Sequence, residues 1–309
     1  MKPVSPTLYP FAEHWFELEP GLRMHYVDEG PRDAPVVLMV HGNPTWSFYW
    51  RRLILALRGT HRVVALDHIG CGKSDKPDDA RYPYRLDRRI ADLERLVEHL
   101  GLGELTLMVH DWGGMIGFGW ADRHPEQVTR AVVLNTAAFG LPETKRMPPS
   151  LSLARDTKLG AVLVRGFNAF ARGATRMAVT RRPLPPEVRD GLIAPYDSWN
   201  NRRATLRFVQ DIPLKPGEPG YATVTGVGER LSQFDDRPVL ICWGAKDFVF
   251  DDHFLRVWEA KLPSAEVHRF ADAGHYVLED AGEEIEALVR RFLGVEASPD
   301  AQAGAEGSP

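Results

Sequence analysis

The sequence predicts an α/β protein with a mostly parallel, doubly wound sheet that is interrupted by an inserted helical segment. Short, continuous apolar runs alternate with helical patterns along the chain, which is typical of parallel strands buried on both faces. No clear strand pattern occurs in the stretch 141–232, which is rich in Arg and aromatic residues. The length of 309 residues suits one α/β body with an insertion.

The predicted elements follow one another in a regular order. The segment 21–28 alternates apolar and polar residues and predicts an edge strand. Apolar runs predict further strands, at 36–40, 62–66, 105–110, 131–134, 239–243 and 266–270. Helical patterns lie between them, for example at 50–57, 86–100, 114–124 and 283–293.

These elements define the expected domains. We interpret 141–232 as a helical cap inserted into one core, which consists of residues 1–140 and 233–296. The tail at 297–309 is rich in Ala, Gly, Ser and Pro, and we expect it to be disordered.

Composition excludes several classes of protein. Hydrophobic residues make up 44% and charged residues 26%, which is typical of a globular chain. No apolar run approaches the roughly 18 residues of a membrane span, and no secretory signal is present, so a cytoplasmic location is expected. The net charge of −4 argues against nucleic acid as a partner. Cys71 and Cys242 lie far apart, and the histidines have no metal-binding spacing, so we expect no disulfide, metal or cofactor.

Charge is spread unevenly along the chain. Residues 151–210 contain eleven Lys and Arg against four Asp and Glu, a local net charge of +7 that leaves −11 for the rest. Such a basic region can dock an acidic partner or the surface of an anionic membrane. The alternative, which we favour on sequence alone, is a set of solvated helix faces, because Arg is also a good surface helix former.

The strongest local signal is the run LTLMVHDWGGM at 105–115. A strand that turns sharply into a helix, with small residues after the turn, is typical of a nucleophile elbow. The turn residue is Asp111 instead of Ser, and Val109 replaces the usual first Gly. A carboxylate at a helix N-terminus stays ionised and can attack carbon to form an ester. The alternative is that Asp111 merely caps the helix.

A second run, HGNPTWSFYWRR at 41–52, follows an early strand. In hydrolases of this architecture, this loop and the residue after the nucleophile supply the oxyanion hole, which here means the amides of Asn43 and Trp112. The Asn43 side-chain amide and the Trp112 indole add further N–H donors that can hold a departing anion. Core packing of Trp112 and turn formation by Asn43 before Pro are the alternatives.

Two later loops supply an acid and a base. Asp247 follows the strand at 239–243, and His275 lies between a late strand and the last helix. The chain order Asp111, Asp247, His275 is the nucleophile–acid–base order of α/β-hydrolases. In this arrangement His275 is the general base, and Asp247 orients its imidazole ring.

With these motifs in place, the chain resembles the haloalkane dehalogenase branch of the α/β-hydrolase superfamily over residues 24–293. The runs HGNPTWSFYWRR, DHIGCGKSDKP and HDWGG carry the resemblance. It implies Asp111 as nucleophile, His275 as base, and Asn43 and Trp112 as the anion-stabilising pair.

The position of the acid subdivides this family. One branch carries the acid after the strand that ends here in VLNT, at 133–136, where this sequence has no carboxylate. Its acid is Asp247, after the later strand, and together with the Asn of HGNP this resembles the third branch of the family.

A narrower likeness is to the β-lactone decarboxylases of bacterial long-chain olefin biosynthesis. The runs NTAAF, FNAFARGATRMAVTRR, APYDSWNNR and RFVQDIPL carry it. It implies conversion of a cis-3,4-dialkyl β-lactone into a cis-olefin and CO2, with attack at either the ring carbon or the carbonyl. It also implies a small, hydrophobic, long-chain substrate and assembly with other olefin-pathway enzymes, including a β-lactone synthetase, with peripheral membrane contact as a further expectation.

An elongated apolar tunnel is expected for such a substrate. The substrate-binding candidates are Phe167, Phe170, Tyr196 and Phe208, with Val162, Leu163 and Met177 as further lining candidates. Ordinary packing inside the cap is the alternative for these side chains.

Other functions stay open at this point. A haloalkane dehalogenase would share every catalytic residue. An epoxide hydrolase would need a tyrosine acid, for which Tyr196 and Tyr221 are available, although Asn43 favours anion binding instead. A non-catalytic docking subunit could use the basic cap. A serine esterase is disfavoured because Asp111 holds the nucleophile position.

Overall fold

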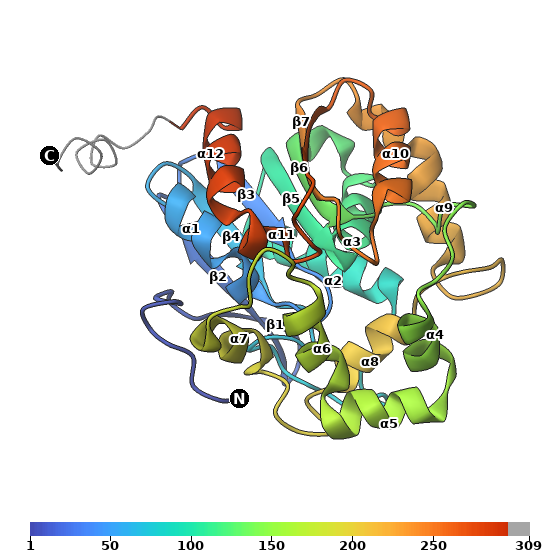
Figure 1. Ribbon diagram of the computed structural model, residues 1–309. Helices are drawn as coiled ribbons and strands as arrows, with labels where there is room; N and C mark the ends of the chain where they lie inside the picture. Colours follow the sequence, from blue (N-terminus) through green and yellow to red (C-terminus); the bar gives the residue numbers. More distant parts are fainter. Residues whose placement is uncertain (296–309) are drawn as a thin grey trace, which may run out of the picture.

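The computed structural model describes residues 1–295, and the tail predicted at 297–309 lies outside them. It confirms the predicted fold class, a mostly parallel sheet with helices on both faces (Figure 1). The sheet order is β1-β2-β4-β3-β5-β6-β7-β8. The strands are β1 His14–Glu19, β2 Leu22–Glu29, β3 Val36–Val40, β4 Arg62–Leu66, β5 Leu105–Asp111, β6 Val128–Thr136, β7 Val239–Gly244 and β8 Glu266–Phe270.

One strand prediction was wrong. The segment predicted as the edge strand is β2, which pairs antiparallel with both β1 and β4 and therefore lies inside the sheet. The edge strand on this side of the sheet is β1, which the sequence analysis missed, and β8 forms the other edge. The side chains of β1 are mostly half-buried, so the segment HWFELE has no clear alternation of buried and exposed residues.

Helices cover the two faces of the sheet in separate layers. One face carries α2 Leu86–His99, α3 Trp112–Ala121 and α10 Asp252–Lys261, whose buried side chains belong to one core cluster. The opposite face carries α1 Arg51–Leu57, α11 Val277–Asp280 and α12 Gly282–Phe292 (Figure 1). Two short 3-10 helices, η1 Ser47–Trp50 and η2 Pro125–Gln127, complete these layers.

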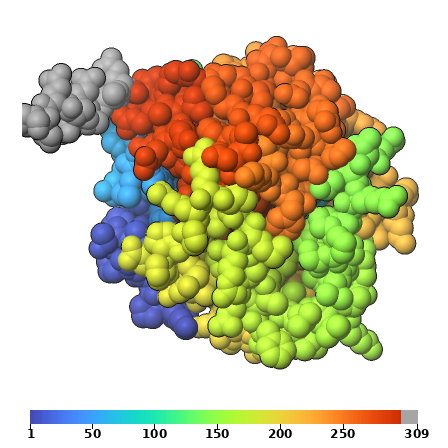
Figure 2. Space-filling model, viewed as in Figure 1, coloured from blue at the N-terminus to red at the C-terminus, as the bar shows by residue number. Residues whose placement is uncertain are grey.

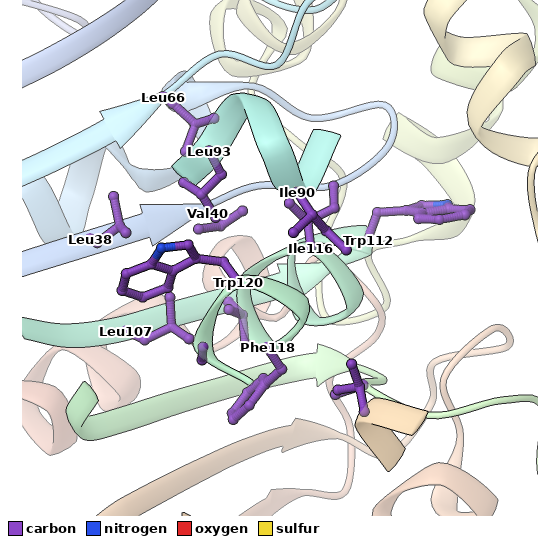
Figure 3. Close-up of a cluster of buried hydrophobic side chains, with 14 of the residues drawn as sticks. Leu38, Val40, Leu66, Ile90, Leu93, Leu107, Trp112, Ile116, Phe118 and Trp120 are labelled. Carbon is purple, nitrogen blue, oxygen red and sulfur yellow. The ribbon is translucent and has the colours of Figure 1, made fainter. Parts of the chain in front are cut away.

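The core alternates between the two faces along each central strand. In β3, Leu38 and Val40 pack into one cluster and Val37 and Met39 into the other, as the two-residue period of a strand requires. Figure 3 shows how strands and helices share the first cluster, through Leu38, Val40, Leu66, Ile90, Leu93, Leu107, Trp112, Ile116, Phe118 and Trp120. Each fully buried aliphatic side chain of this kind contributes about 1.5–3 kcal/mol.

The segment between β6 and β7 is helical, and we refer to it as the helical insertion. It contains α4 Pro149–Asp156, α5 Lys158–Phe167, α6 Ala169–Met177, α7 Pro186–Ile193, α8 Arg203–Gln210, α9 Tyr221–Arg230 and η3 Leu231–Phe234. Figure 1 shows α4 to α8 gathered on one side of the sheet, below the ends of its central strands. Among residues 1–295, no helix has the length and apolar character that a bilayer span requires.

Candidate active site

Asp111 occupies a sharp turn between β5 and α3. Its backbone has φ 53° and ψ −126°, a strained region for a residue other than Gly. Positions 113 and 114 must be glycine, because a Cβ on Gly113 would lie 1.9 Å from the Val40 carbonyl oxygen and one on Gly114 would lie 2.1 Å from Thr136 Oγ1. Strain held in place by close packing of this kind is the geometry of a nucleophile elbow.

His275 lies between two carboxylates. Its Nδ1 is 2.7 Å from Asp247 Oδ2, and its Nε2 is 3.5 Å from Asp111 Oδ2. The structure therefore brings together the three residues that the chain order pointed to. At 3.5 Å the imidazole and the Asp111 carboxylate are in direct ion-pair contact, so His275 lies beside the nucleophile itself.

These neighbours set the charge state of the site. Burial favours neutral His275, but the charges of Asp247 and Asp111 and the hydrogen bonds to both raise its pKa to about 10. Burial also works against an ionised Asp111, but the hydrogen bond and charge of His275 hold the pKa of that carboxyl below its ordinary value of 3.8. At neutral pH the resting site is therefore an imidazolium beside an ionised carboxylate.

Asn135 holds the acid in place, a role that the sequence analysis missed. It lies within 133–136, at the end of the strand after which one branch of the family carries its acid. Its Nδ2 donates to Asp247 Oδ2 at 3.1 Å, and its Oδ1 accepts the Gly244 N–H at 2.7 Å. Asp247 also accepts the Val249 N–H at 2.7 Å. The absence of a carboxylate at 133–136 was the sequence signal that could have pointed to a supporting role for this strand end.

His110 supports the base from behind. Burial and the charge of His275 lower the pKa of His110 to about 3, so it is neutral. Its Nε2–H donates to the backbone carbonyl of His275 at 2.9 Å. This bond ties the end of β5 to the loop that carries the base.

Asn43 contacts the nucleophile in a way that differs from the expected oxyanion hole. Its backbone N–H donates to Asp111 Oδ1 at 2.5 Å, so in the resting site this amide holds the carboxylate itself. Its Nδ2 donates to the Thr205 carbonyl at 3.1 Å, which uses one of its two N–H groups and leaves one free. The Asn43–Pro44 peptide bond is cis.

Trp112 presents its indole to the same site. The side chain lines the cavity next to Asp111, and no hydrogen bond within the described residues engages its Nε1–H. Phe208 packs against the indole, with ring centroids 5.4 Å apart. Trp112 and Asn43 thus bring two free N–H groups to one cavity, and α8 contacts both through Phe208 and Thr205.

An apolar cavity of about 180 Å³ lies over these groups. Asn43, Asp111, Trp112 and His275 contribute the polar part of its wall. The rest comes mainly from the helical insertion and two loops, including Leu141, Met147, Leu151, Phe170, Met177, Val209, Ile212, Val224, Phe248 and Phe250. The site can therefore hold an apolar molecule against a carboxylate with little water.

The substrate-binding candidates of the helical insertion differ in whether their side chains line the cavity. Phe170 and Met177 line the cavity as predicted. Phe208 does not line it and instead supports Trp112 from behind.

Two other candidates are corrected by the structure. Phe167 is 66% exposed at the end of α5, and Tyr196 is buried elsewhere, where its hydroxyl donates to the Thr45 carbonyl at 3.2 Å. Neither lines the cavity, and neither do Val162 and Leu163. Residue type alone did not show which way each side chain faces.

Comparison with known proteins places this geometry in context. A family model described as alpha/beta hydrolase fold matches residues 35–282. A "Cis-3-alkyl-4-alkyloxetan-2-one decarboxylase" from Shewanella oneidensis is 53% identical over 93% of this chain and 90% of its own length. A "Haloalkane dehalogenase" from Mycobacterium marinum is 35% identical over 90% of this chain and 92% of its own length.

Solved structures agree with the sequence relatives. A crystal structure of a loop variant of a haloalkane dehalogenase from Bradyrhizobium elkanii superposes with a TM-score of 0.80 at 26% identity. The match covers 95% of this chain and 99% of that one. The similarity of fold therefore extends over both the sheet and the helical insertion.

Proposed function

The chain belongs to the α/β-hydrolase fold family, within its haloalkane dehalogenase-like branch, and we propose that it converts a cis-3-alkyl-4-alkyloxetan-2-one into a cis-olefin and CO2. The observation that carries this proposal is the ionised carboxylate of Asp111, which faces an apolar cavity beside protonated His275. The name of the Shewanella oneidensis relative specifies a dialkyl oxetan-2-one, which supports this class of substrate.

The first step opens the strained ring. Asp111 attacks the sp3 ring carbon C4, a bond forms between its carboxylate oxygen and C4, and the bond between C4 and the ring oxygen breaks. The ring oxygen leaves as part of a new carboxylate on C3. The free N–H groups of Asn43 and Trp112 are suited to hold this anion while it develops.

The second step releases both products. The bond between C3 and the carboxylate carbon breaks, its electron pair forms the C3–C4 double bond, and the Asp111 carboxylate departs from C4 as CO2 leaves. Neither water nor a proton is consumed. Negative charge returns to Asp111, where the Asn43 backbone N–H and protonated His275 stabilise it. The apolar cavity disfavours the charged carboxylate of the substrate and therefore favours its loss as CO2.

This route also accounts for the stereochemistry. Attack from the rear inverts C4, and anti elimination of CO2 and the Asp111 carboxylate then converts a cis lactone into a cis olefin. Attack at the carbonyl would instead leave an alkoxide on C4, which would need a proton from His275 before it could depart.

Removing the indole N–H should slow the reaction. In Trp112→Phe the ring can still pack against Phe208, but one donor to the developing carboxylate is lost. We expect kcat to fall by about 10²-fold to 10³-fold with little change in KM, because this donor acts mainly on the transition state. Steady-state kinetics with a cis-dialkyl β-lactone measures this, and an unchanged kcat would contradict the role of Trp112.

The pH dependence should show a broad plateau. Asp111 has a lowered pKa and stays ionised down to acidic pH, whereas His275 has a raised pKa and loses its proton only as the pH rises through about 10. We expect kcat/KM to be flat between about pH 5 and pH 9 and to fall above that range. In His275→Gln the rate should be lower throughout and the alkaline fall absent. If His275→Gln keeps that fall, another group titrates there.

One experiment separates the proposed function from dehalogenation. The protein is incubated with a cis-dialkyl β-lactone and, in parallel, with 1-bromohexane, and the products are analysed by gas chromatography. The proposal predicts olefin and CO2 from the lactone. Release of bromide and hexanol alone, with an intact lactone, would instead assign the chain as a haloalkane dehalogenase.

The other candidates have less support. An epoxide hydrolase needs a tyrosine acid at the cavity, but neither Tyr196 nor Tyr221 lines it. Because the substrate is an apolar, strained lactone, we also propose that the enzyme forming the lactone is the partner with which this protein assembles.

A further inference from the structure

The helical insertion exposes a contiguous apolar surface. Leu159 and Val162 lie on one stripe of α5 and are 61% and 45% exposed. Trp199, 46% exposed, lies beside them, since a Cβ on Gly166 would be 3.8 Å from Val162 and 3.7 Å from Trp199. We call Leu159, Val162, Gly166 and Trp199 the apolar patch. Large exposed side chains gathered in this way mark an interaction site.

Cations accompany this patch on α5 and on α6, the next helix along the chain. Lys158, Arg172 and Arg176 are exposed on α5 and α6, and none of them forms an ion pair with any of residues 1–295. The guanidinium of Arg165 stacks over the Trp199 ring at 4.4 Å. Lys158, Arg172 and Arg176 therefore remain available to an external anion, whereas most other Arg side chains of the described residues pair with carboxylates.

The cavity opens close to this surface. Met177 and Phe248 both line the cavity and are at least one-third exposed, so they mark its mouth. Met177 ends α6, and the other end of α6 follows α5, so the mouth lies about 15 Å from the end of the α5 stripe. Figure 2 shows this part of the chain, in yellow-green, forming the lower front of the molecule.

We propose that the apolar patch and the cations Lys158, Arg172 and Arg176 dock the protein on the surface of an anionic lipid bilayer. Trp and aliphatic side chains inserted at the headgroup level, with Lys and Arg beside them, are the pattern of an interfacial helix. Binding to anionic vesicles with no other protein present distinguishes this surface from one that docks an acidic protein partner. Docking here turns the cavity mouth towards the membrane, from which an apolar substrate can enter without crossing water.

Vesicle binding by the full chain tests the proposal. Sedimentation is measured with phosphatidylcholine vesicles that contain or lack phosphatidylglycerol. We expect binding to the anionic vesicles that weakens as salt is added. Arg172→Gln with Arg176→Gln should lower the partition coefficient by about 25-fold, at about five-fold per charge. Leu159→Ser with Val162→Ser should also weaken binding, because both remove apolar area from the contact.

A matched variant elsewhere on the surface is the control. Leu55 on α1 is 40% exposed and Arg256 on α10 is also exposed, so Leu55→Ser with Arg256→Gln removes similar groups away from the patch. This variant should bind as the parent does. Absence of binding to anionic vesicles, or equal loss in the control, would overturn the proposal. No substrate is present, so the result does not depend on the proposed reaction, and thermal unfolding confirms that each variant is folded.

Discussion

Replacing Asp111 with Asn should abolish olefin formation, with a loss of at least about 10⁴-fold in kcat/KM. The amide has nearly the shape of the carboxylate, and its oxygen can still accept the Asn43 backbone N–H that now bonds to Oδ1. It lacks the negative charge that attacks carbon and balances His275. Gas chromatography of a cis-dialkyl β-lactone reaction measures the loss, and thermal unfolding checks that the variant is folded.

A covalent trap strengthens this prediction. With 1-bromohexane, attack by Asp111 forms a bond to carbon and releases bromide, and hydrolysis of the resulting ester needs a base. In His275→Gln the hexyl ester should therefore accumulate, and mass spectrometry of the digested protein should locate it on Asp111. Full activity in Asp111→Asn would refute the role of Asp111 as the nucleophile.

Replacing Gly113 with Ala should destabilise the protein by about 3 kcal/mol or more. The added Cβ would lie 1.9 Å from the Val40 carbonyl oxygen and 2.7 Å from its carbon, both in the backbone of β3. Backbone cannot rotate away as a side chain can, so α3 must move off the sheet. Asp111 immediately precedes this helix, and we expect decarboxylation to fall even where the variant still folds.

Gly173→Ala is the matched control for this prediction. Gly173 lies inside α6, and a Cβ there would meet nothing within 4 Å. Ala is favoured over Gly in a helix by about 0.5–1 kcal/mol, so this variant should be slightly more stable. Urea unfolding of both variants measures the difference. Equal stability of the two would show that the elbow tolerates a larger residue.

Much of the fold followed from local patterns. The strands β3, β4 and β8 were predicted with their observed bounds, and in β3 and β4 this is because a continuous apolar run ends at a polar residue. The edge strand β1 was missed because its half-buried side chains have no clear periodicity. The domain boundaries of the helical insertion remain a prediction.

The amino-acid sequence by itself determined the chemistry of the candidate site, because Asp111, Asp247 and His275 each follow a strand of one parallel sheet. Such strands end at the same edge, so their loops converge whatever lies between them in the chain. Only the tertiary structure decided which insertion residues face the cavity. Phe167 ends α5 and is exposed, whereas Phe170 lies in α6 and lines the cavity. The direction in which each side chain faces depends on how its helix packs against helices far away in the sequence.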